Sequence, residues 1–435
     1  MGMSLNKLTK IVATIGPSSE TEDKIEQLIK AGVNVFRFNT KHSTPAWHAE
    51  KIKLVQSVAD RLAVTIGILL DLQGPEIRLE TRDQKDVPVS ASQLLKIGSS
   101  FVPGVDVAIP HQTVFDILKA GDDLLIDDGF VETTVLKVSE RELVVEVKHD
   151  SVIKHRKGVN LPGKDIDFPA LIDRDLEQLN TNAMNKVDFV GLSFVRSAHD
   201  LAVLRAEMVK REMRSLIVAK IESQPALDRL DEIIESADAI MIARGDLGVE
   251  VPYEQLAYWQ RAIIDKCRLG NKPVITATQM LESMINNPRP TRAEVTDVAH
   301  AIFEGTDAIM LSGESAGGKY PVRAVETMSR IARWNEGKRD VHAVPFDETE
   351  PTSLVASSVV SIVNSRIAPK ISKVLVFTET GYTARVLSKH RLPCPIIAAT
   401  ENKHTSETLT LSFGVEPVLI DLPTGRFDSA DKLIK

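Results

Sequence analysis

The sequence predicts an α/β protein: a TIM (β/α)8 barrel with an inserted all-β lid domain and a C-terminal α/β domain. Three observations support this prediction. Short apolar runs alternate with helical stretches through most of the chain, the alternation breaks once into closely spaced strands, and a further α/β segment follows Pro351. We therefore assign residues 1–80 and 158–345 to the barrel, 81–157 to the lid and 346–435 to the C-terminal domain.

The barrel prediction depends on eight apolar runs, three before the lid and five after it. They are Lys10–Gly16, Val33–Phe38, Ile66–Leu70, Val187–Phe194, Leu216–Ile221, Ala239–Ala243, Pro273–Thr278 and Ala308–Leu311. Because a helical stretch follows each run, the pattern is typical of parallel strands. Eight strands also fit an open doubly wound sheet, but neither a Gly-rich dinucleotide fingerprint nor a Walker A sequence follows any of them.

Helix boundaries are predicted from capping residues. We expect the first helix to begin at a capping box of Ser19 and Glu22 and to end at Gly32. Its buried face is expected to contain Ile25, Leu28 and Ile29. Later helices are expected over residues 201–213, 224–236, 253–269 and 291–304, and the last should begin at a capping box of Thr291 and Glu294.

Alternating apolar residues predict the strands of the lid and of the C-terminal domain. In the lid they are Val87–Val89, Leu124–Ile126, Val131–Val135 and Leu143–Val147. In the C-terminal domain we expect helices at Leu354–Arg366 and Ala384–His390, with strands at Val374–Phe377, Ile396–Ala398 and Pro417–Ile420.

Composition excludes several classes of protein. The net charge of −7 argues against a general nucleic-acid binder, and no apolar run approaches the roughly 18 residues that a membrane helix needs. The first ten residues lack the apolar core of a secretion signal, and Asn6 breaks the myristoylation pattern. Two distant cysteines, Cys267 and Cys394, fit a reducing compartment. The sequence therefore predicts a cytoplasmic protein without nucleic-acid or membrane partners.

Polar residues follow the predicted strands at the end where a TIM barrel carries its active site. They are Arg37, Asn39, Lys41, His42, Asp71, Glu76, Arg78, Ser193, Arg196, Lys220, Glu222, Arg244, Asp246, Thr278, Ser312 and Glu314. Stability alone does not require polar and ionisable groups at the ends of seven strands. We therefore expect these residues to form a functional site.

Glu222 and Asp246, on neighbouring strands, are candidate carboxylate ligands for Mg²⁺ or Mn²⁺. The structural alternative is that each pairs with a basic neighbour such as Arg244. Lys220 shares a strand face with Glu222, where its ammonium group would stabilise a transferring phosphoryl group. Its alternative role is an ion pair with the same carboxylates.

Two further features suit an anionic ligand. The planar guanidinium groups of Arg37 and Arg78 match phosphate oxygens, although either residue could form an ordinary salt bridge. The glycines of the Arg244–Gly248 loop let the backbone approach a ligand, so its N–H groups could bind a carboxylate. Taken alone, this loop also fits any tight turn.

Several long motifs resemble those of the pyruvate kinase family. They are Thr9–Pro17, Leu70–Arg78, Lys157–Gly163, Val218–Ser223, Ile275–Glu294 and Met310–Ala316. The resemblance covers the barrel and the insertion nearly end to end, and the C-terminal domain more loosely. It implies a mobile lid, a regulatory C-terminal domain and phosphoryl transfer from phosphoenolpyruvate to ADP, which gives pyruvate and ATP in the last step of glycolysis.

The resemblance also implies roles for individual residues. Lys220 would stabilise the transferring phosphoryl group, and Glu222 and Asp246 would hold the divalent metal. The phosphate and nucleotide side would consist of Arg37, Asn39, His42, Arg78 and Lys157.

The substrate carboxylate would lie against the amides of Gly245 and Asp246 and against Thr278. Thr278 and Ser312 belong to the region that relays a proton to the enolate carbon. The catalytic residues implied are therefore Lys220, Thr278, Arg37 and Ser312.

One motif departs from the family pattern. The family's Arg-x-Asn-x-Ser-His-Gly reads Arg37 to Ser43 in this chain, with Lys41 at the serine position of a K⁺ site. The other members of that site are Asn39, Asp71 and the carbonyl of Leu72.

The Lys41 ammonium group has two possible destinations in this site. It could replace K⁺ near Asp71, or it could pair with Glu76, the position at which K⁺-independent members usually carry lysine. We hypothesise that activity does not require K⁺. The alternative is that Lys41 points to solvent, with K⁺ bound or its site weakened.

The end of the chain also departs from the family. Relatives usually continue beyond the position of Lys435 with the last strands of the C-terminal domain and one wall of an effector pocket. Residues 378–384 resemble the other wall, which binds an effector phosphate. We therefore expect a shortened domain without typical sugar-bisphosphate activation, unless the sequence is incomplete. The resemblance implies a homotetramer, and a shortened domain leaves a dimer open.

Two rival functions stay open. A catalytically silent paralogue acting as a binding or regulatory protein would be favoured by substitution of Lys220, Glu222, Asp246 or Thr278, and all four are intact. Only Lys41 supports that alternative. A different barrel enzyme that uses phosphoenolpyruvate or an oxoacid, such as an aldolase or a lyase, is disfavoured by the lid and by its return through Asn160 to Gly163.

Overall fold

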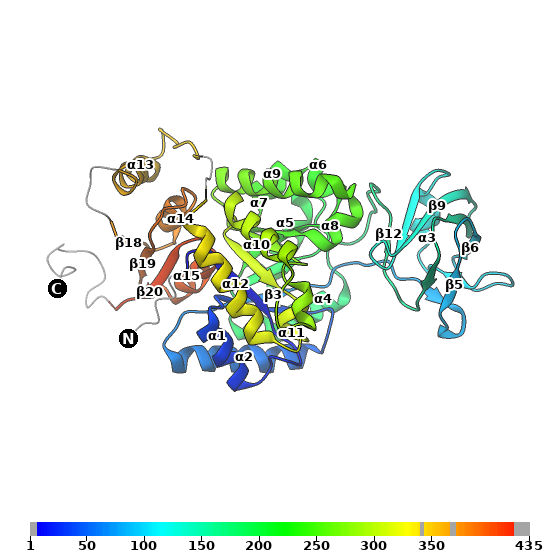
Figure 1. Ribbon diagram of the computed structural model, residues 1–435, viewed down its shortest axis with the longest axis horizontal. Coiled ribbons are helices and arrows are strands. Elements are labelled where there is room, and N and C mark those ends of the chain that lie inside the picture. The colour runs from blue at the N-terminus through cyan, green and yellow to red at the C-terminus, as the bar shows by residue number, and fades with distance from the viewer. Residues whose placement is uncertain (1–6, 340–342, 366–370, 422–435) are drawn as a thin grey trace.

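The computed structural model describes residues 7–339, 343–365 and 371–421. Its central body is a closed parallel barrel, flanked on one side by the mainly antiparallel sheets of the insertion and on the other by a parallel sheet of three strands. Figure 1 shows these parts in a row, with the insertion and the C-terminal sheet at opposite ends of the barrel. The predicted fold class is therefore confirmed.

The barrel closes because its first strand pairs with both the second and the last. Its strands are β1 Lys10–Thr14, β2 Val35–Asn39, β3 Gly67–Asp71, β13 Phe189–Leu192, β14 Leu216–Ile221, β15 Ala239–Ala243, β16 Val274–Ala277 and β17 Ala308–Leu311. All eight predicted strands are present, and closure excludes the open sheet. Apolar side chains such as Leu69 and Met241 fill the interior, and Leu411 of the C-terminal segment belongs to the same cluster.

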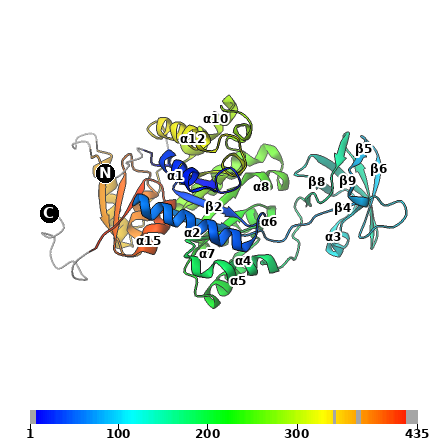
Figure 2. The ribbon, with the colours of Figure 1, turned by 90° about the horizontal axis from the view of Figure 1, so that it is seen from below.

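Helices surround the barrel, as Figure 2 shows from below. The longer ones are α1 Glu22–Ala31, α2 Pro45–Leu62, α4 Asp173–Asn182, α5 Ala198–Lys210, α9 Leu256–Leu269, α10 Arg292–Glu304 and α12 Pro321–Glu336. The shorter ones are α6 Gln224–Asp228, α7 Leu230–Ser236, α8 Arg244–Glu250, α11 Gly313–Ala316, η2 Ala183–Asn185, η3 Tyr253–Gln255 and η4 Glu282–Ile285. The stretch predicted as one helix over residues 224–236 is thus two helices, α6 and α7.

Two predicted helix starts had different outcomes. The capping box of Thr291 and Glu294 is present at α10 and satisfies backbone donors that the first turn leaves free. The predicted box at Ser19 is wrong, because the Ser19 hydroxyl accepts a hydrogen bond from the Gly16 amide instead. Thr21 caps α1, with its side chain accepting from the Lys24 amide.

The insertion has its own apolar core and joins the barrel through two adjacent chain segments. Its elements are β4 Glu80–Thr81, η1 Arg82–Gln84, β5 Val87–Val89, β6 Leu94–Gly98, β7 Val107–Ala108, α3 Gln112–Ile117, β8 Asp123–Ile126, β9 Val131–Val138, β10 Glu142–Val147, β11 Ser151–Ile153 and β12 Val159–Asn160. The strand pattern did not predict α3, β6 or the short strands β4, β7, β11 and β12. At the junction Arg78 bridges Gly158, and the Leu79 amide donates to the Lys157 carbonyl.

The C-terminal sheet packs against the end of the barrel at which the strands begin, where the Gly414 amide donates to the Leu8 carbonyl just before β1. Its elements are α13 Pro351–Val363, β18 Val374–Phe377, α14 Tyr382–Ser388, β19 Ile396–Thr400, α15 Lys403–Thr408, η5 Leu409–Leu411 and β20 Val415–Leu419. The expectation about the chain end at Lys435, and the predicted helix end at Arg366, lie outside the described residues. Among the described residues no helix is long and apolar enough to cross a membrane.

Candidate active site

A cleft of about 340 Å³ separates the mouth of the barrel from the insertion. Its walls include Lys41, Glu76, Arg78, Asp127, Lys157, Asn160, Phe194, Arg196, Asp246 and Glu250. These residues come from strand ends of the barrel and from the facing strands of the insertion. The cleft therefore opens where a TIM barrel carries its chemistry.

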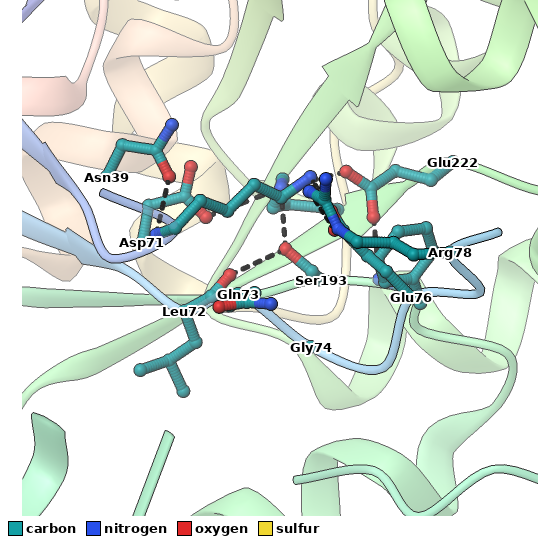
Figure 3. A network of polar contacts seen from close by, with 12 residues as sticks. Asn39, Asp71, Leu72, Gln73, Gly74, Glu76, Arg78, Ser193 and Glu222 are labelled. Atoms are coloured by element: carbon teal, nitrogen blue, oxygen red, sulfur yellow. Dashed lines mark hydrogen bonds and ion pairs between the residues drawn. The ribbon is translucent and has the colours of Figure 1, made fainter. Parts of the chain in front are cut away.

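Lys220 lies beneath this cleft at the centre of a buried polar network. Its ammonium nitrogen lies 2.8 Å from Glu222, 2.6 Å from the Ser193 hydroxyl and 3.4 Å from Asp71. Ser193 in turn donates to the Leu72 carbonyl, as Figure 3 shows. The ion pair that we considered as an alternative for Lys220 is thus present in this structure. It holds the ammonium group in a fixed position.

Neighbouring charges favour the ionised forms of Lys220 and Asp71 against the effect of burial. Burial alone would lower the pKa of Lys220, but the carboxylates of Asp71 and Glu222 raise it above its ordinary value. Burial would likewise raise the pKa of Asp71, yet the cations of Lys220 and Arg37 hold it below its ordinary value. For Glu222, burial outweighs the attraction of Lys220, so the pKa is raised.

Arg37 is anchored by the carboxylate of Asp71. Its Nε donates to Asp71 over 2.6 Å, and a terminal nitrogen donates to the Thr14 hydroxyl over 3.0 Å. The side chain is only 10% exposed, so its direction is set by these bonds. Arg37 is therefore a fixed positive charge beside Lys220.

Lys41 forms an ion pair with Glu76, which is the second of the two options that we considered. Arg78 reaches the other oxygen of the same carboxylate at 2.7 Å, as Figure 3 shows. Burial alone would raise the pKa of Glu76. The two cations lower this pKa by more than burial raises it, so it lies below the ordinary value. Asn39 does not contact the ammonium group; its side-chain oxygen accepts from the Lys41 amide.

The loops after β15 and β16 are joined by two residues. The Thr278 hydroxyl accepts from the Gly245 amide over 2.8 Å and donates to the Ala277 carbonyl. Thr278 has a φ of 68°, an unusual and strained value for a β-branched residue. Arg244 clamps this loop, because it donates to the Thr278 carbonyl and forms a two-pronged ion pair with Asp297.

Arg244 is therefore not the partner of the candidate metal ligands. Glu222 is bound by Lys220 and by the Phe194 amide. The Asp246 carboxylate has neither a hydrogen bond nor an ion pair in the described part of the chain, although it lines the cleft. A free carboxylate next to a second, buried one fits a hard divalent cation such as Mg²⁺ or Mn²⁺.

Ser312 lies at the end of β17, the last barrel strand. Its amide donates to Glu314, whose carboxylate also accepts from the Leu281 amide. The Ser312 hydroxyl is buried and finds no hydrogen-bond partner among the described residues. A buried hydroxyl without a partner is uncommon in a folded protein, so Ser312 stays a candidate for a functional role.

The remaining predicted residues are more exposed. Lys157 pairs with Asp127 of the insertion at 2.7 Å, so it faces the cleft from the lid side. Arg78 is 45% exposed and also donates to the Arg156 carbonyl. His42 is exposed at the surface and does not line the cleft.

Sequence reasoning missed several cleft residues, among them Glu250. It lies at the end of α8 and accepts a weak bond of 3.5 Å from Asn160. Burial raises the pKa of Glu250 to about 7. Its position four residues after Asp246 was an available signal, because such residues share a helix face.

Comparison with known proteins shows which family this chain belongs to. Residues 6–325 match the model of the pyruvate kinase barrel domain, and residues 353–435 match that of the pyruvate kinase alpha/beta domain. The chain belongs to the pyruvate kinase family. It is 40% identical to the pyruvate kinase of Bacillus licheniformis over 94% of this chain and 71% of the relative. The sequence identity to the pyruvate kinase of Geobacillus stearothermophilus is 38%, with the same coverage.

A solved pyruvate kinase structure supports the same conclusion. The enzyme from Cryptosporidium parvum superposes with a TM-score of 0.92 and 32% identity, covering all of this chain and 92% of that one. The chain is thus a phosphotransferase that converts phosphoenolpyruvate and ADP into pyruvate and ATP. Nothing in these comparisons favours the silent paralogue. Pyruvate kinases generally use Mg²⁺ and K⁺.

Proposed function

We propose that Lys220 is the catalytic cation of this enzyme and that Glu222 and Asp246 hold Mg²⁺ or Mn²⁺. The divalent ion, when bound, neutralises phosphate and enolate oxygens of phosphoenolpyruvate. Lys220 supports the proposal by its burial and by its fixed distance to Glu222. Arg37 adds a second fixed charge for the phosphoryl oxygens. Phosphoryl transfer depends mainly on such positioning and charge neutralisation.

We place the substrate carboxylate against the amides of Gly245 and Asp246 and the Thr278 hydroxyl. In the free enzyme, the Gly245 amide and the Thr278 hydroxyl satisfy each other. A bound carboxylate would accept from the Gly245 amide in place of the Thr278 hydroxyl, which would leave the Thr278 oxygen free to accept a hydrogen bond. We propose that Thr278 and the unpartnered Ser312 hydroxyl relay a proton to the enolate carbon.

We place ADP between the barrel mouth and the lid. Arg37, Asn39, His42, Arg78 and Lys157 are the proposed nucleotide and phosphate side, and of these Arg78 and Lys157 line the cleft. Lys157 is carried by the lid hinge and Arg78 faces it across the junction. Closure of the lid would exclude water, so that the phosphoryl group reaches ADP rather than being hydrolysed.

The function is tested by a lactate-dehydrogenase-coupled assay with phosphoenolpyruvate and ADP. Replacing Lys220 by Met should lower kcat roughly 10²- to 10³-fold, because a preorganised charge at the transition state is lost. Lys266→Met is the matched control, because Lys266 pairs with Asp231 at the surface. Equal kcat values for the two variants would contradict the role of Lys220.

We further propose that activity is independent of K⁺. Two contacts support this proposal: the ion pair between the Lys41 ammonium group and Glu76, and the hydrogen bond from the Lys41 amide to Asn39. The Lys41 charge also contributes to the lowered pKa of Asp71. A covalently attached ammonium group would do the work that a bound K⁺ does in relatives.

Rates in K⁺ buffer and in tetramethylammonium buffer decide this proposal. The unmodified enzyme should have the same rate in both, within about twofold. Lys41→Ser should lose most activity in tetramethylammonium and regain it in K⁺, whereas the exposed Lys53→Ser should behave like the parent. Strong activation of the parent enzyme by K⁺ would overturn the proposal.

Other assignments stay proposals. We divide the chain at residues 80, 157 and 345, although the strands of the insertion begin at Glu80 and end at Asn160. Two free buried cysteines, Cys267 and Cys394, support a cytoplasmic location. A homotetramer, or a dimer, is expected from the family.

A further inference from the structure

The base of the barrel, opposite the active site, repeats one structural device. Four barrel strands are each preceded by a residue with a polar side chain. The oxygen of that side chain accepts a hydrogen bond from a backbone N–H group of the neighbouring strand. The bonds are Ile11 to Asn34 (3.1 Å), Ile68 to Asp188 (2.8 Å), Ile217 to Asp238 (2.8 Å) and Val274 to Asp307 (3.1 Å). These bonds satisfy amides at the lower edge of the barrel.

At three of the four positions a cation completes the site. Lys7 donates to Asn34 at 2.6 Å, Arg205 to Asp238 at 3.1 Å and Arg391 to Asp307 at 2.6 Å. Asp188 is the exception among these four. It faces Glu407 and His404 of α15, which could themselves ligate a cation.

The three residues form a compact set of ligands. One ligand atom from each of Asp188, His404 and Glu407 lies within 4.8 Å of the other two. Asp188 is 2% exposed, and the other two are half-buried. His404 and Glu407 are three residues apart on one helix, so both can face the same point.

The nearest lysine only borders this cluster. Lys403 lies 3.7 Å from Glu407 but also 3.4 Å from Asp60, so its charge is shared. The charge of Lys186 also acts on Glu407. The carboxyl groups of Asp188 and Glu407 hydrogen-bond to each other, so in the absence of a cation they must share a proton.

We propose that Asp188, His404 and Glu407 bind a divalent transition metal, for which Zn²⁺ is the best match. Two carboxylates and one imidazole are a common ligand set for Zn²⁺, with water in the fourth position. Mg²⁺ prefers oxygen ligands alone and would select the active site instead. The ion would take the place that Lys7, Arg205 and Arg391 occupy at the equivalent strands. Because α15 lies between the barrel and the C-terminal sheet in both views, the metal would join these two parts (Figures 1 and 2).

Zn²⁺ titration of the full-length enzyme tests this proposal. Isothermal titration is performed with excess Mg²⁺, which occupies the active-site carboxylates. We expect one Zn²⁺ per chain, a raised midpoint of thermal unfolding, and visible absorption bands when Co²⁺ replaces Zn²⁺. Metal binding should also weaken at acid pH, where His404 is protonated.

Variants separate this site from the rest of the surface. His404→Ala and Glu407→Gln should each weaken Zn²⁺ binding at least tenfold and abolish the thermal shift. His199→Ala removes an exposed histidine of α5 and should leave both unchanged. Both test positions are half-buried, so the variants should fold, and circular dichroism checks this. No Zn²⁺ binding in excess Mg²⁺, or equal binding by all variants, would overturn the proposal and leave a shared proton between the carboxyl groups.

Discussion

Glu250 illustrates how the cleft changes the chemistry of a single residue. Its carboxyl group is buried near Asp246 and has no cation as a partner among the described residues, so its pKa rises from 4.5 to about 7. An acid with a raised pKa binds more protons in the folded state than in the unfolded state between these values. Stability therefore falls as pH rises from about 4.5 to 7, and the loss is complete above this window.

Glu250→Gln should remove this dependence. The difference in free energy of unfolding between the variant and the parent should shift in favour of the variant as pH rises from 5 to 8. The shift should be at most on the order of 3 kcal/mol. Scanning calorimetry at several pH values measures the difference, with the exposed Glu254→Gln as the control. An equal difference between variant and parent at pH 5 and pH 8 would show that the carboxyl group is not responsible.

The sequence identified residue types better than residue partners. Lys220, Glu222 and Asp246 were predicted because strand ends of a barrel converge, and they do meet at one end of it. The partner of Arg244 was not predictable, because Asp297 is 53 residues away and reaches it only through the packing of α10. For Lys41 the motif gave two options, and only the structure distinguishes Glu76 from Asp71.

At the scale of elements, α8 positions the loop after β16. Arg244, the first residue of α8, binds the carbonyls of Ala277 and Thr278 and the carboxylate of Asp297 at once. This clamp keeps the Thr278 backbone in its strained conformation. A shift of about 1 Å in such a loop can cost roughly 10²-fold in rate.

Arg244→Lys should therefore lower kcat roughly 10²-fold without unfolding the enzyme. Lysine keeps the charge but lacks the planar fork that reaches several acceptors. Steady-state kinetics with both substrates provides the measurement, and Arg229→Lys is the control because its ion pair with Asp165 lies at the surface. Parent-like kinetics of Arg244→Lys would mean that the loop holds itself in place.

Regular elements were predictable where the sequence pattern is long. All eight barrel strands and the capping box of α10 were found, because each carries a continuous apolar run or a paired cap. Five strands of the insertion were missed. No period can be read from β4, β7, β11 and β12, which have two or three residues each, whereas β6 was missed although it has five. The cap of α1 was predicted at the wrong residue. The Ser19 hydroxyl lies in a tight turn and accepts from the Gly16 amide rather than from an amide of the helix.

At the scale of the whole molecule, the C-terminal segment contributes a residue to the apolar cluster that fills the barrel, while the C-terminal sheet has a core of its own. Leu411, from η5, is 1% exposed and contacts the apolar residues that fill the barrel. A β-carbon at Gly67, at the start of β3, would lie 2.4 Å from the Thr410 hydroxyl, so the two parts meet without spare room. The barrel is thus closed from below by a residue of another domain.

Leu411→Ala should destabilise both parts together. Truncation of a buried leucine costs about 2–5 kcal/mol, and here the cavity would lie at the junction. Calorimetry should show a single lowered transition, whereas Leu375→Ala, which truncates a leucine that is 58% exposed, should change little. Separate transitions, with only the C-terminal one lowered, would show that the barrel does not depend on Leu411.

The same leucine has a consequence for synthesis of the protein in the cell. The last barrel strand ends at Leu311, but Leu411 leaves the ribosome about a hundred residues later. At roughly 5–20 residues per second, the nascent barrel waits on the order of 5–20 s with its lower end open to water. During that interval the exposed apolar lower end of the barrel is a target for chaperones. This end closes only when the C-terminal segment arrives.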